Sequence, residues 1–250
     1  MSNGRIAGNT DKSIPMIALM QMKEGRESWE ARDCIARHSH AQAYIAIVLS
    51  GGYEECGSRG RFRVEPGDVL LHDAFDGHLD RFRCKGAQIL NLAATGLALN
   101  FSIGQVSDPD TIARAAEGDV AEARACLRKQ LMEKPSAAED WPDILARDLL
   151  ADPGCRLDAW ADQHGLSAEA VSRGFGKVFE QTPAAFRAEA RARRAFALIT
   201  GTDAPLASIA AAAGFADQAH MSRCMRALTG LPPGAWRKSN PFKTERTRAA

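Results

Sequence analysis

The sequence lacks the features that mark membrane, secreted or disulfide-rich proteins. No apolar run reaches the length of about 18 residues that a membrane-spanning helix needs, and residues 1–15 lack the basic and apolar regions of a secretory signal. The six cysteines include no C-x-x-C pair, so we expect reduced thiols rather than disulfides or thiolate metal ligands. We therefore expect a cytoplasmic protein without membrane contact.

Motifs of nucleotide and hydrolase chemistry are also missing. The chain has no Walker loop, no G-x-S-x-G elbow and no dinucleotide fingerprint.

Aromatic residues make up only 6% of the sequence, but hydrophobic residues make up 45% of its 250 residues, which can supply the core of one large domain or two ordinary ones. We expect a globular protein that is not an enzyme.

The net charge of +1 conceals two halves of opposite sign. Residues 1–152 hold 18 Lys and Arg against 23 Asp and Glu, which gives −5, whereas residues 153–250 hold 14 against 8, which gives +6. A basic half beside an acidic half suits a chain in which only one domain meets a polyanion such as DNA.

The first half of the chain has the pattern of an antiparallel β-barrel. Short β-branched and aromatic segments alternate with glycine and charged turns up to Phe101. We expect strands at 44–49, 61–64, 69–72, 79–84 and 88–93. The Gly51-Gly52 pair is expected to end the first of these strands. Residues 1–106 therefore predict a small β-barrel.

Helical spacing replaces the β pattern after residue 106. Apolar residues recur at helical intervals over 107–131 and again over 141–150, with charges between them. These apolar stripes fit two arrangements, packing on the barrel or packing on a second subunit. The sequence Asp152-Pro153-Gly154 breaks the helix, so we expect a helical connector, with a possible dimerisation role, over 107–152.

The basic half contains one pattern twice. Residues 157–167 read LDAWADQHGLS, and residues 206–216 read LASIAAAAGFA. In both copies a small alanine (Ala161, Ala210) allows two helices to cross closely, and a glycine four positions later (Gly165, Gly214) suits the positive φ of a tight turn. Each copy therefore predicts a helix-turn-helix whose second helix presents Ser and Arg.

The second copy resembles the signature of the AraC/XylS family of bacterial transcription regulators. The resemblance rests on residues 209–223, on the closing segment 228–233, and on Trp236-Arg237; the first copy follows it through Ser167, 171–173, Phe175 and Thr182-Pro183. The earlier segments His38-Ser39-His40, Leu49-Ser50-Gly51 and 66–71 are similar to the cupin-like sensor domain of the same family.

The resemblance implies an α+β fold in which a cupin-like antiparallel barrel and its helical connector precede an all-α domain of two helix-turn-helix units. The DNA-binding domain spans 153–240, and 241–250 form a tail. It implies double-stranded DNA, a small-molecule effector and RNA polymerase as partners, usually for activation, with a possible homodimer.

The second helix of each unit carries the residues expected to contact DNA. They are Glu169, Ser172, Arg173 and Lys177 in the first unit and Gln218, His220, Ser222, Arg223 and Arg226 in the second. Arg173 and Arg223 are the expected base readers, because a guanidinium can donate to both O6 and N7 of guanine. His220 fits a DNA contact or a packing role equally well.

Two glycines, Gly174 and Gly176, interrupt the first of these helices, and each is expected to cost about 1 kcal/mol relative to alanine. The first unit is therefore expected to be the looser reader.

Histidines gather in the predicted barrel. We expect the effector to contact His38, His40, Tyr44, His72, His78 and Arg81. Three of these histidines (His38, His40, His78) stand where a metal-binding cupin places ligands, and three imidazoles suit Zn²⁺ or Fe²⁺. The usual carboxylate ligand is missing, however, and Glu54 or Glu55 replaces it only if the strand geometry permits. An effector pocket and ordinary polar histidines therefore remain alternatives, and no cofactor is expected. The competing function is a metal-dependent cupin oxygenase or isomerase with a helical appendage.

Overall fold

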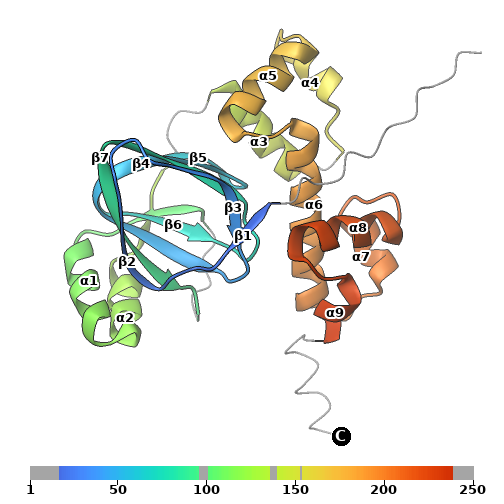
Figure 1. The fold of residues 1–250 in the computed structure, drawn as a ribbon. Helices are drawn as coiled ribbons and strands as arrows, with labels where there is room; N and C mark the ends of the chain where they lie inside the picture. The colour runs from blue at the N-terminus through green and yellow to red at the C-terminus, as the bar shows by residue number, and fades with distance from the viewer. Residues whose placement is uncertain (1–16, 96–100, 136–139, 153, 239–250) are drawn as a thin grey trace, which may run out of the picture. The chain divides into compact units, whose positions relative to one another are not determined.

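The computed structural model describes residues 17–95, 101–135, 140–152 and 154–238 (Figure 1). The predicted tail at 241–250 and Pro153 of the predicted break lie outside these residues. The described chain forms two compact units, 17–186 and 187–238, which we treat separately. Within the described residues no helix combines the length and the apolar character of a membrane span.

The first unit is built on a nine-stranded sheet. Its strands are β1 (Ala18–Met20), β2 (Gly25–Trp29), β3 (Cys34–His40), β4 (Tyr44–Gly57), β5 (Gly60–Val64), β6 (Asp68–His72), β7 (His78–Ala93), β8 (Ile103–Gln105) and β9 (Met132–Glu133). β7 pairs with β4 along one edge and with β2 and β3 along the other, and β4 also pairs with β5 and β6. The two long strands thus form the centre of the sheet.

Glycines allow β4 and β7 to bend while they stay paired. Gly51 and Gly86 adopt φ angles of +74° and +63°, and a Cβ on Gly51 would overlap the carbonyl oxygen of Gly86. The register between the two strands shifts on both sides of Gly51. The bend rolls the sheet around an interior (Figure 1).

The structure corrects three details of the predicted barrel. The Gly51-Gly52 pair does not end its strand, because glycine tolerates the positive φ that lets β4 continue to Gly57. The segments 79–84 and 88–93 form one bent strand, β7, instead of two. The sheet is mixed, since β1 and β3 run parallel, and its pairing within the described residues does not close into a barrel.

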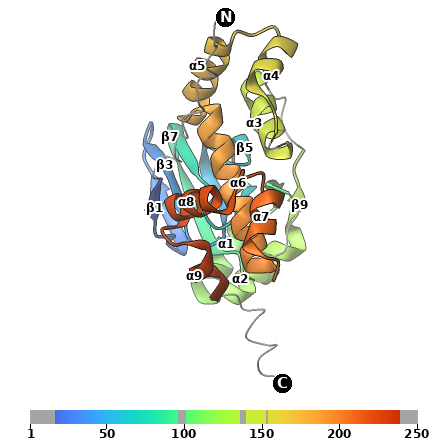
Figure 2. The ribbon, with the colours of Figure 1, turned by 90° about the vertical axis from the view of Figure 1, so that its right-hand side faces the viewer.

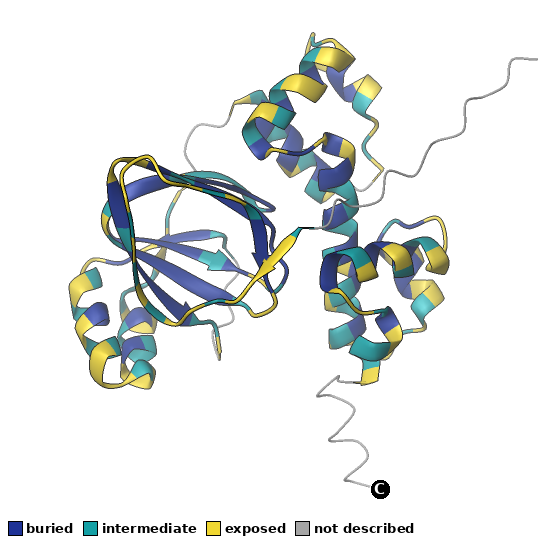
Figure 3. Ribbon diagram, in the orientation of Figure 1, coloured by how far each residue is buried: buried dark blue, intermediate teal, exposed yellow. Residues whose placement is uncertain are grey.

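Helices α1 (Pro109–Gly118) and α2 (Val120–Gln130) cover the outer face of this sheet. Ile112 and Leu127 are buried against Ile45 and Leu92, which alternate along their strands with residues that face the interior. Figure 3 shows the exposed residues of α1 and α2 on the sides away from the sheet. Of the two predicted arrangements, the stripe of 107–131 therefore packs on the sheet of its own chain.

The first unit also contains the first half of the predicted DNA-binding domain. α3 (Trp141–Ala151), α4 (Leu157–Gln163), α5 (Ala168–Phe179) and the start of α6 (Pro183–Gly201) share one apolar core. This core includes Cys56 of β4 and Leu79 of β7. The first helix-turn-helix is thus fixed to the sheet by buried side chains.

The second unit contains the rest of α6 together with α7 (Leu206–Ala212), α8 (Gln218–Thr229) and α9 (Pro233–Lys238) (Figure 2). Its core includes Ile199, Ile209 and Met225, all 2% exposed or less. Trp236 packs edge-on against Phe196, with ring centroids 5.0 Å apart. The indole N–H of Trp236 donates to the Thr229 hydroxyl at 2.8 Å.

Candidate functional site

The helices α4 and α5 form the first helix-turn-helix. Ala161 is 2% exposed, as close helix crossing requires, and Gly165 has a φ of +65°. Ser167 begins α5 by accepting a hydrogen bond at its side chain from the backbone N–H of Ala170. These features confirm the turn predicted from the sequence.

The helices α7 and α8 repeat this arrangement in the second unit. Ala210 is 1% exposed and Gly214 has a φ of +82°. Asp217 takes the place of Ser167 as N-cap, and its carboxylate accepts from the backbone N–H of His220. That hydrogen bond lowers the pKa of Asp217.

The outer face of α5 carries the residues predicted to meet DNA in the first unit. Glu169, Ser172, Arg173 and Lys177 are all exposed. Arg173 Nη1 lies 3.8 Å from Glu169 Oε2, one helical turn away, in a solvent-exposed pair that contributes little to stability. Little stability is therefore lost when Arg173 leaves this ion pair to bind a nucleic acid.

The corresponding face of α8 is less uniform. Gln218, Arg223 and Arg226 are exposed, whereas His220 and Ser222 are half-buried. The Ser222 hydroxyl donates to the Gln218 carbonyl oxygen at 2.8 Å, and the His220 ring packs edge-on against a phenyl ring with centroids 5.2 Å apart. Of the two roles open to His220, its contacts favour packing.

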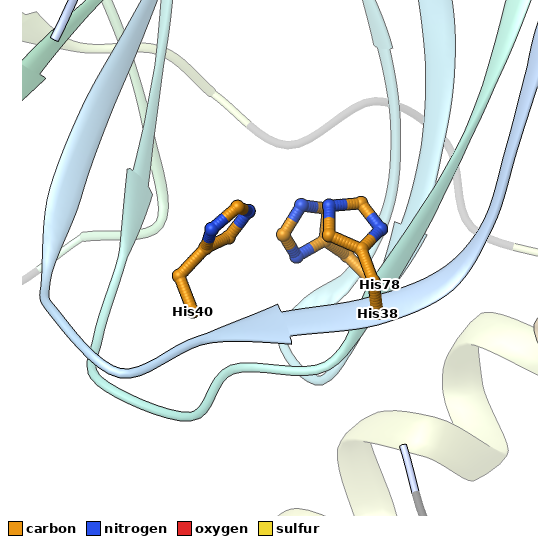
Figure 4. Close-up of side chains that lie close together, drawn as sticks. All are labelled: His38, His40 and His78. Carbon is orange, nitrogen blue, oxygen red and sulfur yellow. The ribbon is translucent and has the colours of Figure 1, made fainter. Parts of the chain in front are cut away.

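The rolled sheet encloses a cavity of about 120 Å³. Its walls include the predicted residues His38, His40, Tyr44 and His78. Three of these rings lie together at one side: the centroids of His38 and His78 are 4.2 Å apart, and those of His38 and His40 are 5.0 Å apart. Figure 4 shows the His40 ring turned toward the other two.

Buried carboxyl groups line the same cavity. Burial raises the pKa of Asp80 to about 8 and raises the pKa of Glu55 well above its usual range. Burial also lowers the pKa of His38 to about 4 and that of His72 to about 3. His72 Nε2 lies 3.6 Å from Glu55 Oε2, and burial disfavours the charged form of both side chains.

Two of the residues predicted for the effector lie elsewhere. His72 stacks on Tyr44, with centroids 4.3 Å apart, and borders a small neighbouring pocket of about 10 Å³. Arg81 points away from the cavity, toward α5: its guanidinium donates to Glu180 Oε1 at 3.0 Å and to the Val178 carbonyl oxygen at 3.4 Å.

Comparisons with known proteins match the helical part of the chain. Residues 160–239 match the family described as a helix-turn-helix domain. The C-terminal part belongs to the AraC-type helix-turn-helix family. The chain is accordingly a DNA-binding transcription regulator. No curated protein matches the sequence.

Solved structures that resemble this chain include full-length and partial regulators. ToxT from Vibrio cholerae with a bound unsaturated fatty acid is 9% identical with a TM-score of 0.42, and covers 87% of this chain and 95% of its own. The C-terminal domain of AraT from Geobacillus stearothermophilus is 18% identical with a TM-score of 0.39, covering 42% and 88%. The family assignment rests on the sequence match alone, since these TM-scores are below 0.5.

The AraC-type domain has a local feature that explains one of its two unusual glycines. A Cβ at Gly174 would overlap the Trp141 ring, which packs on α5 from α3. Gly176 has no such neighbour, because the atom closest to its Cβ position is 3.9 Å away. The missing side chain of Gly174 therefore makes room for the Trp141 ring, and this glycine is not a sign of a loosely packed helix.

Of the two carboxyl groups in the cavity, Glu55 was a candidate from the sequence, whereas Asp80 was missed. The alternation of side chains along a strand could have placed it there, because residues two apart on a strand share a face. His78, Asp80 and Phe82 all line the cavity from β7. The same alternation places Leu79 and Arg81 on the opposite face of β7, toward α5.

Proposed function

We propose that this regulator binds DNA through α5 and α8 and that a ligand in the cavity of the sheet controls this binding. The observation that carries the proposal is the position of β4 and β7. Their inner faces line the cavity with Glu55 and Asp80, and their outer faces hold α5 through Cys56 and Leu79. A ligand that moves the inner residues acts on strands that support the first reading helix.

Strand geometry makes this coupling direct. Glu55 pairs with Asp80 across the two strands, and Cys56 pairs with Leu79 in the next register position. The two pairs are adjacent along the same two strands, so a change in the distance between the strands at one pair also changes it at the other. Because neighbouring residues point to opposite faces, a movement inside the cavity reaches the face that holds α5. A ligand that binds one strand spacing more tightly than another shifts the population toward that spacing, and with it the position of α5.

DNA recognition is assigned to the exposed faces of the two reading helices. Arg173 and Arg223 read guanine, Gln218 reads adenine, and Lys177 and Arg226 contact phosphates. The two helices enter successive major grooves, about 34 Å apart. In this proposal the protein acts in the cytoplasm, and its domain 153–240 contacts RNA polymerase as an activator. A homodimer, where one forms, uses the connector 107–152.

The test of DNA reading is genome-wide sequencing of DNA bound by the wild type and by single Arg173→Ala and Arg223→Ala variants. We expect a two-part motif in the wild type, and each variant should lose preference in one part, by about 1–3 kcal/mol of discrimination. Arg83→Ala is the matched control, because Arg83 is an exposed arginine of β7.

The control variant should keep the full motif. Loss of preference in the same part of the motif with both variants would contradict the assignment of one helix to each part. Equal enrichment of the motif in the wild type and in both variants would exclude these arginines as readers.

A further inference from the structure

We propose that His38, His40 and His78 bind one divalent transition-metal ion, which is then the ligand, or part of the ligand, that controls DNA binding. The regulatory part rests on the proposed function, whereas metal binding stands by itself. The three side chains come from two strands: His38 and His40 lie at the end of β3, and His78 begins β7.

The hydrogen bonds of the three rings prepare one nitrogen of each for a metal. Nδ1 lies 3.1 Å from the Ala36 carbonyl oxygen in His38 and 3.1 Å from the Met20 carbonyl oxygen in His40. Nδ1 of His78 lies 3.2 Å from the carbonyl oxygen of Asp76. A carbonyl oxygen only accepts, so each Nδ1 carries the proton and each Nε2 keeps its lone pair. Histidines that bind metals are held in this way by carbonyl groups.

The spacing of the three rings fits a single ion. One nitrogen of each histidine lies within 4.8 Å of the other two. A central point is then no more than about 2.8 Å from each of them, and a zinc–imidazole bond is about 2.0–2.1 Å long. Side-chain shifts of less than about 1 Å close this gap, well within ordinary rotamer adjustment.

The ligand set indicates the class of ion. Three neutral imidazoles favour Zn²⁺, Fe²⁺, Co²⁺ and related ions over Mg²⁺ or Ca²⁺, which prefer oxygen ligands. All three histidines border the cavity of about 120 Å³, which leaves the remaining coordination positions open to water or to an organic anion. Tyr44 Oη lies within hydrogen-bond distance of His78 Nε2, at 3.2 Å, and an ion that binds this nitrogen replaces that hydrogen bond.

A second group of side chains, Glu55, His72 and His78, competes for the ion. Glu55 and His78 also line the larger cavity, but His72 borders the neighbouring pocket of only about 10 Å³, about the minimum for one water molecule. His72 is only 5% exposed and is stacked on Tyr44, so it has little freedom to move toward an ion. The larger cavity therefore favours the set that contains His38 and His40.

The test is a titration of the untagged full-length chain with Co²⁺, followed by visible absorption and by competition with Zn²⁺. We expect ligand-field bands that saturate at one ion per chain and disappear when Zn²⁺ is added. His40→Ala should weaken Co²⁺ binding more than about 100-fold, because even outer-shell changes at metal sites cost 10–100-fold. His164→Ala, outside the cavity, should leave the titration unchanged.

The variant His72→Ala separates the two ligand sets and should retain binding. The absence of cobalt bands in the wild type would overturn the proposal without any variant, so it stays testable if His40→Ala does not fold. Loss of binding in His72→Ala but not in His40→Ala or His38→Gln would also overturn it.

DNA affinity with and without Zn²⁺ is a separate readout. A change in affinity that His40→Ala removes would support metal control. Co²⁺ binding without any change in DNA affinity would support the metal site and overturn control by the metal.

Discussion

Gly174 and Gly176 lie on the same turn of α5, yet the same substitution should change stability in opposite directions. Gly176→Ala should stabilise the protein by about 1 kcal/mol, because alanine loses less backbone entropy in a helix and the Cβ makes only an ordinary van der Waals contact. Gly174→Ala should destabilise it by about 1–3 kcal/mol, because the Cβ overlaps the Trp141 ring. Denaturant unfolding of the two variants measures both effects.

The double variant Gly174→Ala with Trp141→Leu provides the control for this prediction. Leucine removes the indole ring, so Gly174→Ala should cost less in that background than in the wild type. An equal cost in both backgrounds would show that Trp141 is not the reason for Gly174.

At the scale of elements, apolar packing should hold α5 on the sheet far more strongly than the ion pair at its edge. Leu79 is fully buried in the shared core, so Leu79→Ala should cost about 2–5 kcal/mol of unfolding free energy. The side chains of Arg81 and Glu180 are 33% and 41% exposed. A double-mutant cycle between them should give a coupling of only about 0.2–1 kcal/mol. A coupling energy as large as the cost of Leu79→Ala would contradict the prediction that apolar packing contributes more than the ion pair.

The elements also show what the sequence could predict. The turn glycines Gly165 and Gly214 are local signals, and the structure confirms them because a turn depends on its own residues. The bends of β4 and β7 were missed, because a glycine that ends a strand and one that bends it look alike until the partner strand is known. The contact of Trp141 with Gly174 was missed for the same reason, since it joins distant parts of the chain.

At the scale of the whole molecule, the basic residues 153–250, with their net charge of +6, should make DNA binding steeply dependent on salt. Each lost phosphate contact lowers the slope of log K against log salt by about 1, so Lys177→Ala with Arg226→Ala should lower it by about 2. Fluorescence anisotropy between about 50 and 200 mM salt measures this slope. Lys85→Ala, an exposed lysine of β7, is the matched control and should leave it unchanged. Preference for the motif should survive in the double variant, because phosphate contacts carry no sequence information; an unchanged slope would mean that these two residues do not reach the DNA backbone.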